Sequence, residues 1–149
     1  MYNSTLAGGS PNPQGLYNHG PMLVHHNGTF ICAWYNGPQR EYVENRVVFA
    51  TSTDAVVWTD PQELFPAVNV HGEENEPFPV VSGRLYAAAS DSAWGNKHDS
   101  GLQGALLVRR MDPLGPIFWV ARQRPDPAIT NSTAYPMWTE MDPETRGDM

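Results

Sequence analysis

Three consecutive residues near the start of the chain carry groups suited to holding a sugar. Tyr17, Asn18 and His19 offer an aromatic ring, an amide and an imidazole. An aromatic face packs against a sugar ring, while an amide hydrogen-bonds its hydroxyls. We therefore consider these three residues as a substrate-binding group. The alternative for His19 is a loop histidine without a catalytic role, because no partner stands beside it in the sequence.

Several glutamates are candidates for chemistry. Glu41 and Glu44 lie in a polar connector, and Glu76 directly precedes an apolar run. A carboxylic acid acts as general acid or base when its pKa suits the working pH. The alternative for Glu41 is a solvated loop charge. Glu73 and Glu74 are expected to be solvent-exposed, and Glu76 is a candidate sugar contact because it abuts a strand. No metal-ligand spacing is diagnostic here, so we predict no metal and no cofactor.

The elements that must position these residues occur twice along the chain. An apolar run, a turn centred on Gly28 or Gly83, a second apolar run and a third strand form each unit. The spacing of the two glycines is typical of propeller-like arrays. One small antiparallel sheet cannot bury both of its faces, so we expect about two modules of a larger stack. No sustained helical stripe is present, and helix is at most a minor component.

The strand that follows Gly28 is apolar on both faces. One face carries Phe30, Cys32 and Trp34, and the other carries Ile31, Ala33 and Tyr35. This pattern is typical of a strand that is covered on both sides. The Asn27-Gly28 pair predicts a tight hairpin before it. The predicted organisation is an N-terminal loop over 1–20, two modules over 21–121 (about 21–66 and 77–121) and an irregular tail over 122–149.

A turn motif after the third strand suggests a family. The stretch STDAVVWTDP from Ser52 to Pro61 resembles the Asp-box (BNR repeat) of sialidases, or neuraminidases. Asp54 and Trp58 match its Asp and Trp, with one residue fewer between them and without its glycine. In that motif the Asp accepts backbone hydrogen bonds and the Trp packs beneath the turn, so we expect both residues to be architectural. The order of elements around the motif also resembles the first two blades of a sialidase propeller.

This resemblance implies an all-β fold, namely an incomplete β-propeller of about two antiparallel blades from a six-bladed parent. It also implies hydrolysis of a terminal sialic acid, with three arginines clamping the substrate carboxylate. At the first clamp position this chain has His19, and a neutral imidazole does not replace a bidentate guanidinium. The acid–base position of that family falls in the polar connector, where Glu41 is the nearest match and Glu44 the next.

The remaining arginines and the Tyr–Glu nucleophile pair belong to later blades. The resemblance therefore implies an exo-α-sialidase-like glycoside hydrolase region that is not catalytically complete alone, with a sialylated or other glycan as partner. A non-catalytic glycan- or protein-binding propeller is the first alternative. A truncated gene product with no independent role is the second.

Composition excludes several other partners. The net charge is −7 with nine Lys plus Arg, so no basic face is available for nucleic acid. No apolar run is long enough to span a membrane. The successive Arg109 and Arg110 point to opposite faces of their strand, where we expect a surface salt bridge, or contact with a central funnel. Blade faces left uncovered predict self-association.

Overall fold

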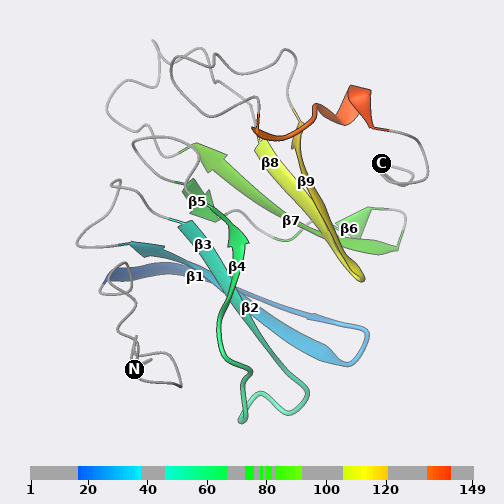
Figure 1. The fold of residues 1–149 in the computed structure, drawn as a ribbon. Helices are drawn as coiled ribbons and strands as arrows, with labels where there is room; N and C mark the ends of the chain where they lie inside the picture. The colour runs from blue at the N-terminus through cyan, green and yellow to red at the C-terminus, as the bar shows by residue number, and fades with distance from the viewer. Residues whose placement is uncertain are drawn as a thin grey trace.

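The computed structural model describes residues 17–37, 46–66, 73–75, 78, 80–81, 83–91, 106–120 and 134–141. These residues form two antiparallel sheets that face each other (Figure 1). The first sheet has the order β1 (Tyr17–His26), β2 (Thr29–Gly37), β3 (Arg46–Ser52) and β4 (Gln62–Phe65). The second has the order β5 (Glu73–Asn75), β7 (Arg84–Asp91), β8 (Leu106–Met111) and β9 (Leu114–Val120), with β6 (Val80–Val81) also paired to β7.

The two predicted glycine turns connect neighbouring strands. Asn27 and Gly28 have φ angles of 47° and 77° between β1 and β2, and Gly83 has a φ of 75° between β6 and β7. Two consecutive positive φ angles are those of the tight hairpin turn that Asn-Gly favours. The predicted hairpin is therefore confirmed, whereas β4 and β5 are strands that the sequence pattern did not reveal.

The first strand begins earlier than expected. β1 starts at Tyr17 rather than at Pro21, so Tyr17 to Gly20 belong to the sheet and not to an N-terminal loop. The register with β2 shifts between His19 and Met22, and Gly20 has a φ of 60°. A bulge of this kind lets a strand continue through an irregular residue.

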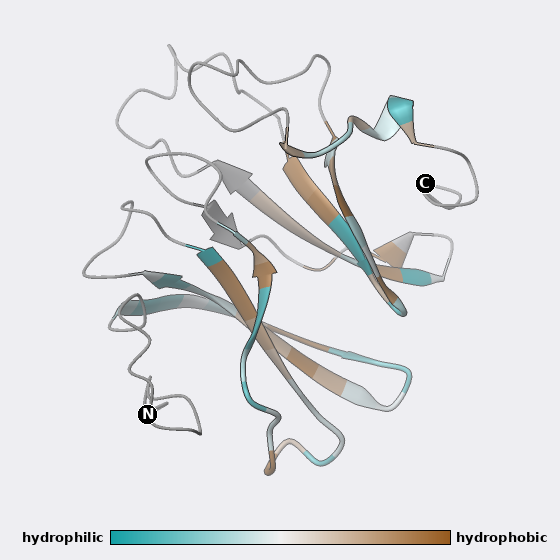
Figure 2. Cartoon of the chain, in the orientation of Figure 1, coloured by the Kyte–Doolittle hydropathy of each residue, from teal (hydrophilic) through white to brown (hydrophobic). Residues whose placement is uncertain are grey.

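Apolar side chains from both sheets form one core between them. Ile31, Ala33 and Phe49 of the first sheet belong to the same buried cluster as Ala87 and Leu107 of the second. Figure 2 shows apolar residues along the central strands of both sheets. The alternation predicted for β2 is confirmed, because the odd-numbered residues enter this core and the even-numbered ones point to the opposite face.

Polar side chains also link the two sheets. Asn27 Nδ2 donates to Asp112 Oδ2 at 3.2 Å. Arg109 Nη1 donates to the Leu64 carbonyl of β4 at 3.3 Å, and its Nε donates to the Gly115 carbonyl at 2.7 Å. Burial lowers the pKa of Arg109. The guanidinium of Arg109 therefore binds backbone carbonyls and ties β8 to the first sheet, in place of the surface salt bridge that was expected.

Part of the predicted irregular tail covers the second sheet. The 3-10 helix η2 (Trp138–Glu140) follows a short segment whose Pro136 carbonyl accepts the Trp119 N–H at 2.9 Å. Trp138 and Met141 pack against the buried cluster on the outer face of β7, β8 and β9. Within the described ranges, no helix is long and apolar enough to cross a membrane.

Candidate functional site

The start of β1 brings two of the predicted sugar-binding residues together. In the register of β1 with β2, His19 lies opposite the buried Tyr35. The His19 ring centroid is 5.9 Å from that of Tyr17 and 5.4 Å from that of Tyr35. Three rings therefore form one aromatic cluster at this end of the sheet, with His19 exposed in its middle.

Asn18 points to the other face and joins a chain of hydrogen bonds. Its Oδ1 accepts from Trp34 Nε1 at 2.9 Å and from Asn36 Nδ2 at 2.8 Å. Asn36 Oδ1 accepts from Arg46 Nε at 3.2 Å, and Arg46 Nη1 lies 3.5 Å from Glu63 Oε2. The Asn18 oxygen predicted to contact a sugar is thus already bonded twice within the protein, and it holds β1 against β2.

The other candidate residues lie outside the described residues. These are Glu41, Glu44 and Glu76. Among the residues that are described, no three His, Cys, Asp or Glu side chains are grouped so as to hold a metal ion. The described part of the site therefore consists of aromatic and amide groups.

The turn after β3 is held by Asp54. Asp54 Oδ1 accepts from the N–H groups of Val57 at 2.8 Å and Val56 at 2.9 Å, and from Ser52 Oγ at 3.0 Å. These hydrogen bonds, that of Val57 first, lower the pKa of the Asp54 carboxyl. Ser52 Oγ in turn accepts from the Ala55 N–H at 2.9 Å. Asp54 has the architectural role that the sequence predicted.

Alanine occupies the position in this turn that needs a positive φ. Ala55 has a φ of 61°, a conformation that usually favours glycine. Its carbonyl accepts a hydrogen bond from Trp58 Nε1 at 3.2 Å. The Thr59 N–H donates to the Thr51 carbonyl at 2.9 Å and closes the loop. The turn keeps its hydrogen bonds without the glycine that was expected, at the cost of one strained alanine.

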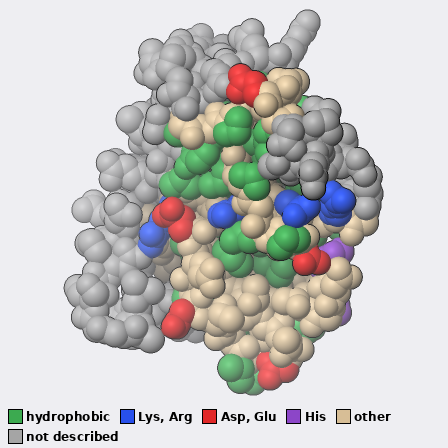
Figure 3. Space-filling model, turned by 45° about the vertical axis from the view of Figure 1, so that its right-hand side comes forward, with side chains coloured by type: hydrophobic (Ala, Val, Ile, Leu, Met, Phe, Trp, Pro, Cys, Tyr) green, Lys and Arg blue, Asp and Glu red, His purple; other side chains and the backbone are tan. Residues whose placement is uncertain are grey.

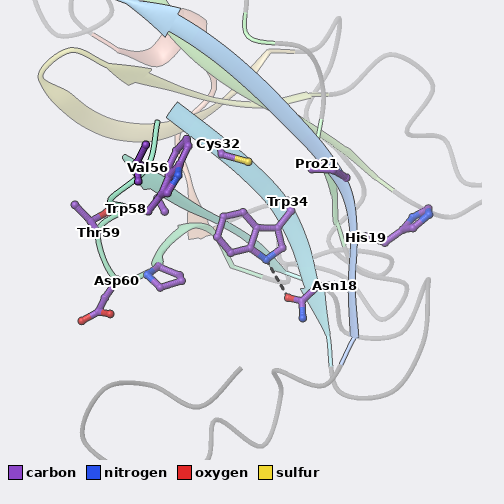
Figure 4. Close-up of a pocket in the computed structure, with 11 residues that line it drawn as sticks. Asn18, His19, Pro21, Cys32, Trp34, Val56, Trp58, Thr59 and Asp60 are labelled. Carbon is purple, nitrogen blue, oxygen red and sulfur yellow. Dashed lines mark hydrogen bonds between the residues drawn. The ribbon is translucent and has the colours of Figure 1, made fainter. Parts of the chain in front are cut away.

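A groove of about 540 Å³ lies on the face of the first sheet that points away from the second. Its lining is mostly apolar and includes Pro21, Cys32, Trp34, Val56, Trp58 and Pro61. Asn18 and His19 of the candidate sugar site also line the groove. Figure 4 shows Trp34 and Trp58 among its lining side chains. Burial raises the pKa of the Cys32 thiol, which stays free.

Sequence reasoning did not identify this groove. The apolar even-numbered face of β2 was its only signal, and it was interpreted as a face covered by a neighbouring sheet. Figure 3 shows a different face of the molecule, on which a few basic side chains are separated by apolar and acidic ones. The described residues of that face therefore form no broad basic area for a polyanion.

Two face-packed antiparallel sheets, each built from consecutive strands, define a fragment of a β-propeller. Residues 9–90 match the family described as BT_1020-like, N-terminal beta propeller, and the chain belongs to this family. No curated protein matches. Among solved structures the chain is similar to a sialidase, with 25% sequence identity and a TM-score of 0.66 over 89% of this chain.

The comparison confirms the predicted fold class. The chain is all-β and forms an incomplete, sialidase-like β-propeller of about two antiparallel blades. It spans 15% of the sialidase chain that it matches.

Proposed function

We propose that this chain is part of a sialidase-like propeller that binds or acts on the terminal sugars of glycans, and that it is not catalytically complete alone. The observation that carries this proposal is the aromatic cluster of Tyr17, His19 and Tyr35, which lies at one end of a sheet belonging to a propeller similar to that of a sialidase. The exposed His19 ring and the partly exposed Tyr17 ring lie at a strand end, where they are suited to stack against a sugar.

The strand register supports a site at one end of the first sheet. Tyr17 pairs with Gly37, and Asn36 pairs with Arg46, so β1 begins where β2 ends and β3 begins. Glu41 falls between Gly37 and Arg46 in the sequence. The connector that carries Glu41 therefore leaves and re-enters the sheet at the Tyr17 end, which supports Glu41 as the acid–base candidate.

The proposed site combines these groups by their chemistry. Tyr17 and His19 contact the sugar, and Asn18 fixes the strand that carries them through its two hydrogen bonds. Glu76 is retained as a further contact. An assembled enzyme would be an exo-α-sialidase-like glycoside hydrolase, in which further blades supply the cationic clamp and the nucleophile.

A non-catalytic glycan- or protein-binding propeller is the second candidate. One observation favours it: His19 stands where the resemblance expects an arginine. Aromatic side chains without an acid–base pair bind a sugar but do not cleave it.

Sugar titrations of the 149-residue chain test the proposal. We expect tyrosine fluorescence or ligand-observed NMR to detect sialyllactose or lactose, and Tyr17→Ala to weaken that binding by about tenfold, or about 1.4 kcal/mol. Leu23→Ala is the matched control, because Leu23 is an exposed apolar residue of the same strand, 64% exposed. Absence of binding to either sugar, or equal loss in both variants, would refute the proposal.

Hydrolysis is tested separately with a fluorogenic sialoside. Release of the fluorophore that is abolished by Glu41→Gln supports the enzyme. Sugar binding without release, unchanged in Glu41→Gln, supports the binding module instead.

A further inference from the structure

We propose that Asn27 is a site of spontaneous deamidation, and that this modification weakens the contact between the two sheets. Asn27 follows the last residue of β1, whereas Tyr17 is the first residue of that strand. The proposal therefore concerns the opposite end of the strand from the proposed sugar site and does not rest on it.

The reaction needs only an asparagine, the residue after it, and water. The backbone nitrogen of Gly28 gives up its proton to a base and attacks Cγ of Asn27. A bond forms between these two atoms, the Cγ–Nδ2 bond breaks, and Nδ2 takes up a proton and leaves as ammonia. Water then opens the succinimide ring to aspartate or isoaspartate, and no atom is oxidised or reduced. A following glycine favours the reaction because it has no side chain to hinder the attack.

The turn leaves the reacting groups accessible. The register of β1 with β2 ends at the pair His26 and Thr29, so Asn27 and Gly28 lie outside the ladder of paired residues. Both turn residues are exposed. No atom lies within 4 Å of a Cβ built on Gly28. The nitrogen of Gly28 can therefore approach the side chain of Asn27 without displacing packed groups.

A second Asn-Gly pair of the same chain is protected by its surroundings. Asn36 and Gly37 are the last residues of β2, and Asn36 is 5% exposed. Its Nδ2 donates to Asn18 Oδ1 at 2.8 Å, and its Oδ1 accepts from Arg46 Nε at 3.2 Å. The same reaction at Asn36 requires local opening of the sheet. The sequence offers two equal candidates, and the structure selects Asn27.

The product changes a contact between the sheets. Asn27 Nδ2 donates to Asp112 Oδ2 at 3.2 Å, and Asp112 lies in the turn between β8 and β9. Figure 1 shows these two turns close to one another. Deamidation removes the donor and sets a second carboxylate against that of Asp112, so a hydrogen bond is replaced by repulsion between like charges. Isoaspartate also adds one carbon atom to the main chain of a two-residue turn.

Incubation of the folded chain in mildly alkaline buffer tests the site. Fragmentation mass spectrometry locates each amide-to-acid conversion. We expect Asn27 to react about tenfold faster or more than Asn36, because only Asn36 requires local opening. The control is the same incubation in a urea concentration that unfolds the chain. Both Asn-Gly pairs are then accessible, and their rates should become similar.

Two variants test the effect on the contact between the sheets. Asn27→Asp reproduces the aspartate product in homogeneous form. It should raise the equilibrium constant for unfolding by about two- to tenfold, the usual effect of losing one hydrogen bond. The double variant Asn27→Asp with Asp112→Asn exchanges donor and acceptor and keeps the net charge of the wild type. This double variant should recover most of the lost stability in urea unfolding.

The results that would overturn the proposal are specific to each half of it. Equal rates at Asn27 and Asn36 in the folded chain, or a faster reaction at Asn36, would overturn the assignment of the site. An unchanged unfolding constant in Asn27→Asp, or no recovery when Asp112→Asn is added, would overturn the effect on the contact between the sheets.

Discussion

Gly20 provides a sharp test of how the first strand is positioned. It has a φ of 60° in the bulge of β1. A Cβ atom at this position would lie 2.5 Å from Cζ and 2.6 Å from the hydroxyl oxygen of Tyr35. Tyr35 is buried and contacts His19. The substitution Gly20→Ala therefore disturbs both the backbone and the aromatic cluster.

The expected cost is the sum of two effects. An alanine forced into the left-handed region costs about 1–2 kcal/mol. Displacement of the buried Tyr35 ring adds about 1–3 kcal/mol, the usual range for overpacking. We therefore expect Gly20→Ala to lower the free energy of unfolding by about 2–5 kcal/mol.

Gly28→Ala separates the two effects. Gly28 also has a positive φ, 77°, but no atom lies within 4 Å of its hypothetical Cβ. Gly28→Ala should therefore lower the free energy of unfolding only by the backbone contribution, about 1–2 kcal/mol. Urea unfolding followed by tryptophan fluorescence measures both variants. If Gly20→Ala is no more destabilising than Gly28→Ala, the close approach of Tyr35 to the β1 backbone is wrong.

Three further substitutions test the turn and the link between the sheets. Ala55→Gly should stabilise the protein by up to about 1 kcal/mol in thermal or urea unfolding, because glycine relieves the positive φ while losing some of that gain to chain entropy. The pKa of Asp54 is lowered in the folded state. The ionised carboxylate therefore stabilises the folded protein fully above the unfolded-state pKa of about 3.9, and this stabilisation is lost as the pH falls through the folded-state pKa. Asp54→Asn should flatten that acid limb in unfolding curves measured from pH 6 to pH 2, and an unchanged limb would contradict the assignment. Arg109→Met should lower the free energy of unfolding by about 1–3 kcal/mol, because the Leu64 carbonyl loses its donor from the other sheet. Arg110→Met is the control and should lower it by less, because it removes a hydrogen bond to the nearby Pro113 carbonyl.

Local patterns predicted the strands and the hairpin well. The Asn27-Gly28 turn depends on two residues that tolerate positive φ, and the alternation along β2 depends on which side chains can be buried. Both are properties of a short segment, so the sequence alone carries them. Repetition of the same pattern then indicated two sheets of similar construction.

Features set by contacts between distant residues could not be predicted in this way. Arg109 follows the same alternation as its neighbours, yet its role depends on a carbonyl of β4 that lies 45 positions away. Likewise, Gly20 in the early part of β1 lies against the ring of Tyr35, 15 positions away in the sequence. Alternation specifies the face of a side chain but not the group that it meets there.

In the candidate site too, the sequence predicted the residue types but not the groups that they contact. Consecutive residues of β1 point to opposite faces, so Tyr17 and His19 join the aromatic cluster while Asn18 reaches Trp34. The sequence grouped the three as one sugar-binding unit because they are adjacent. In the sheet, His19 belongs to the aromatic cluster and Asn18 bonds Trp34, while both residues line the groove. The hydrogen bond from Trp34 to Asn18 thus holds the strand that presents His19 against β2.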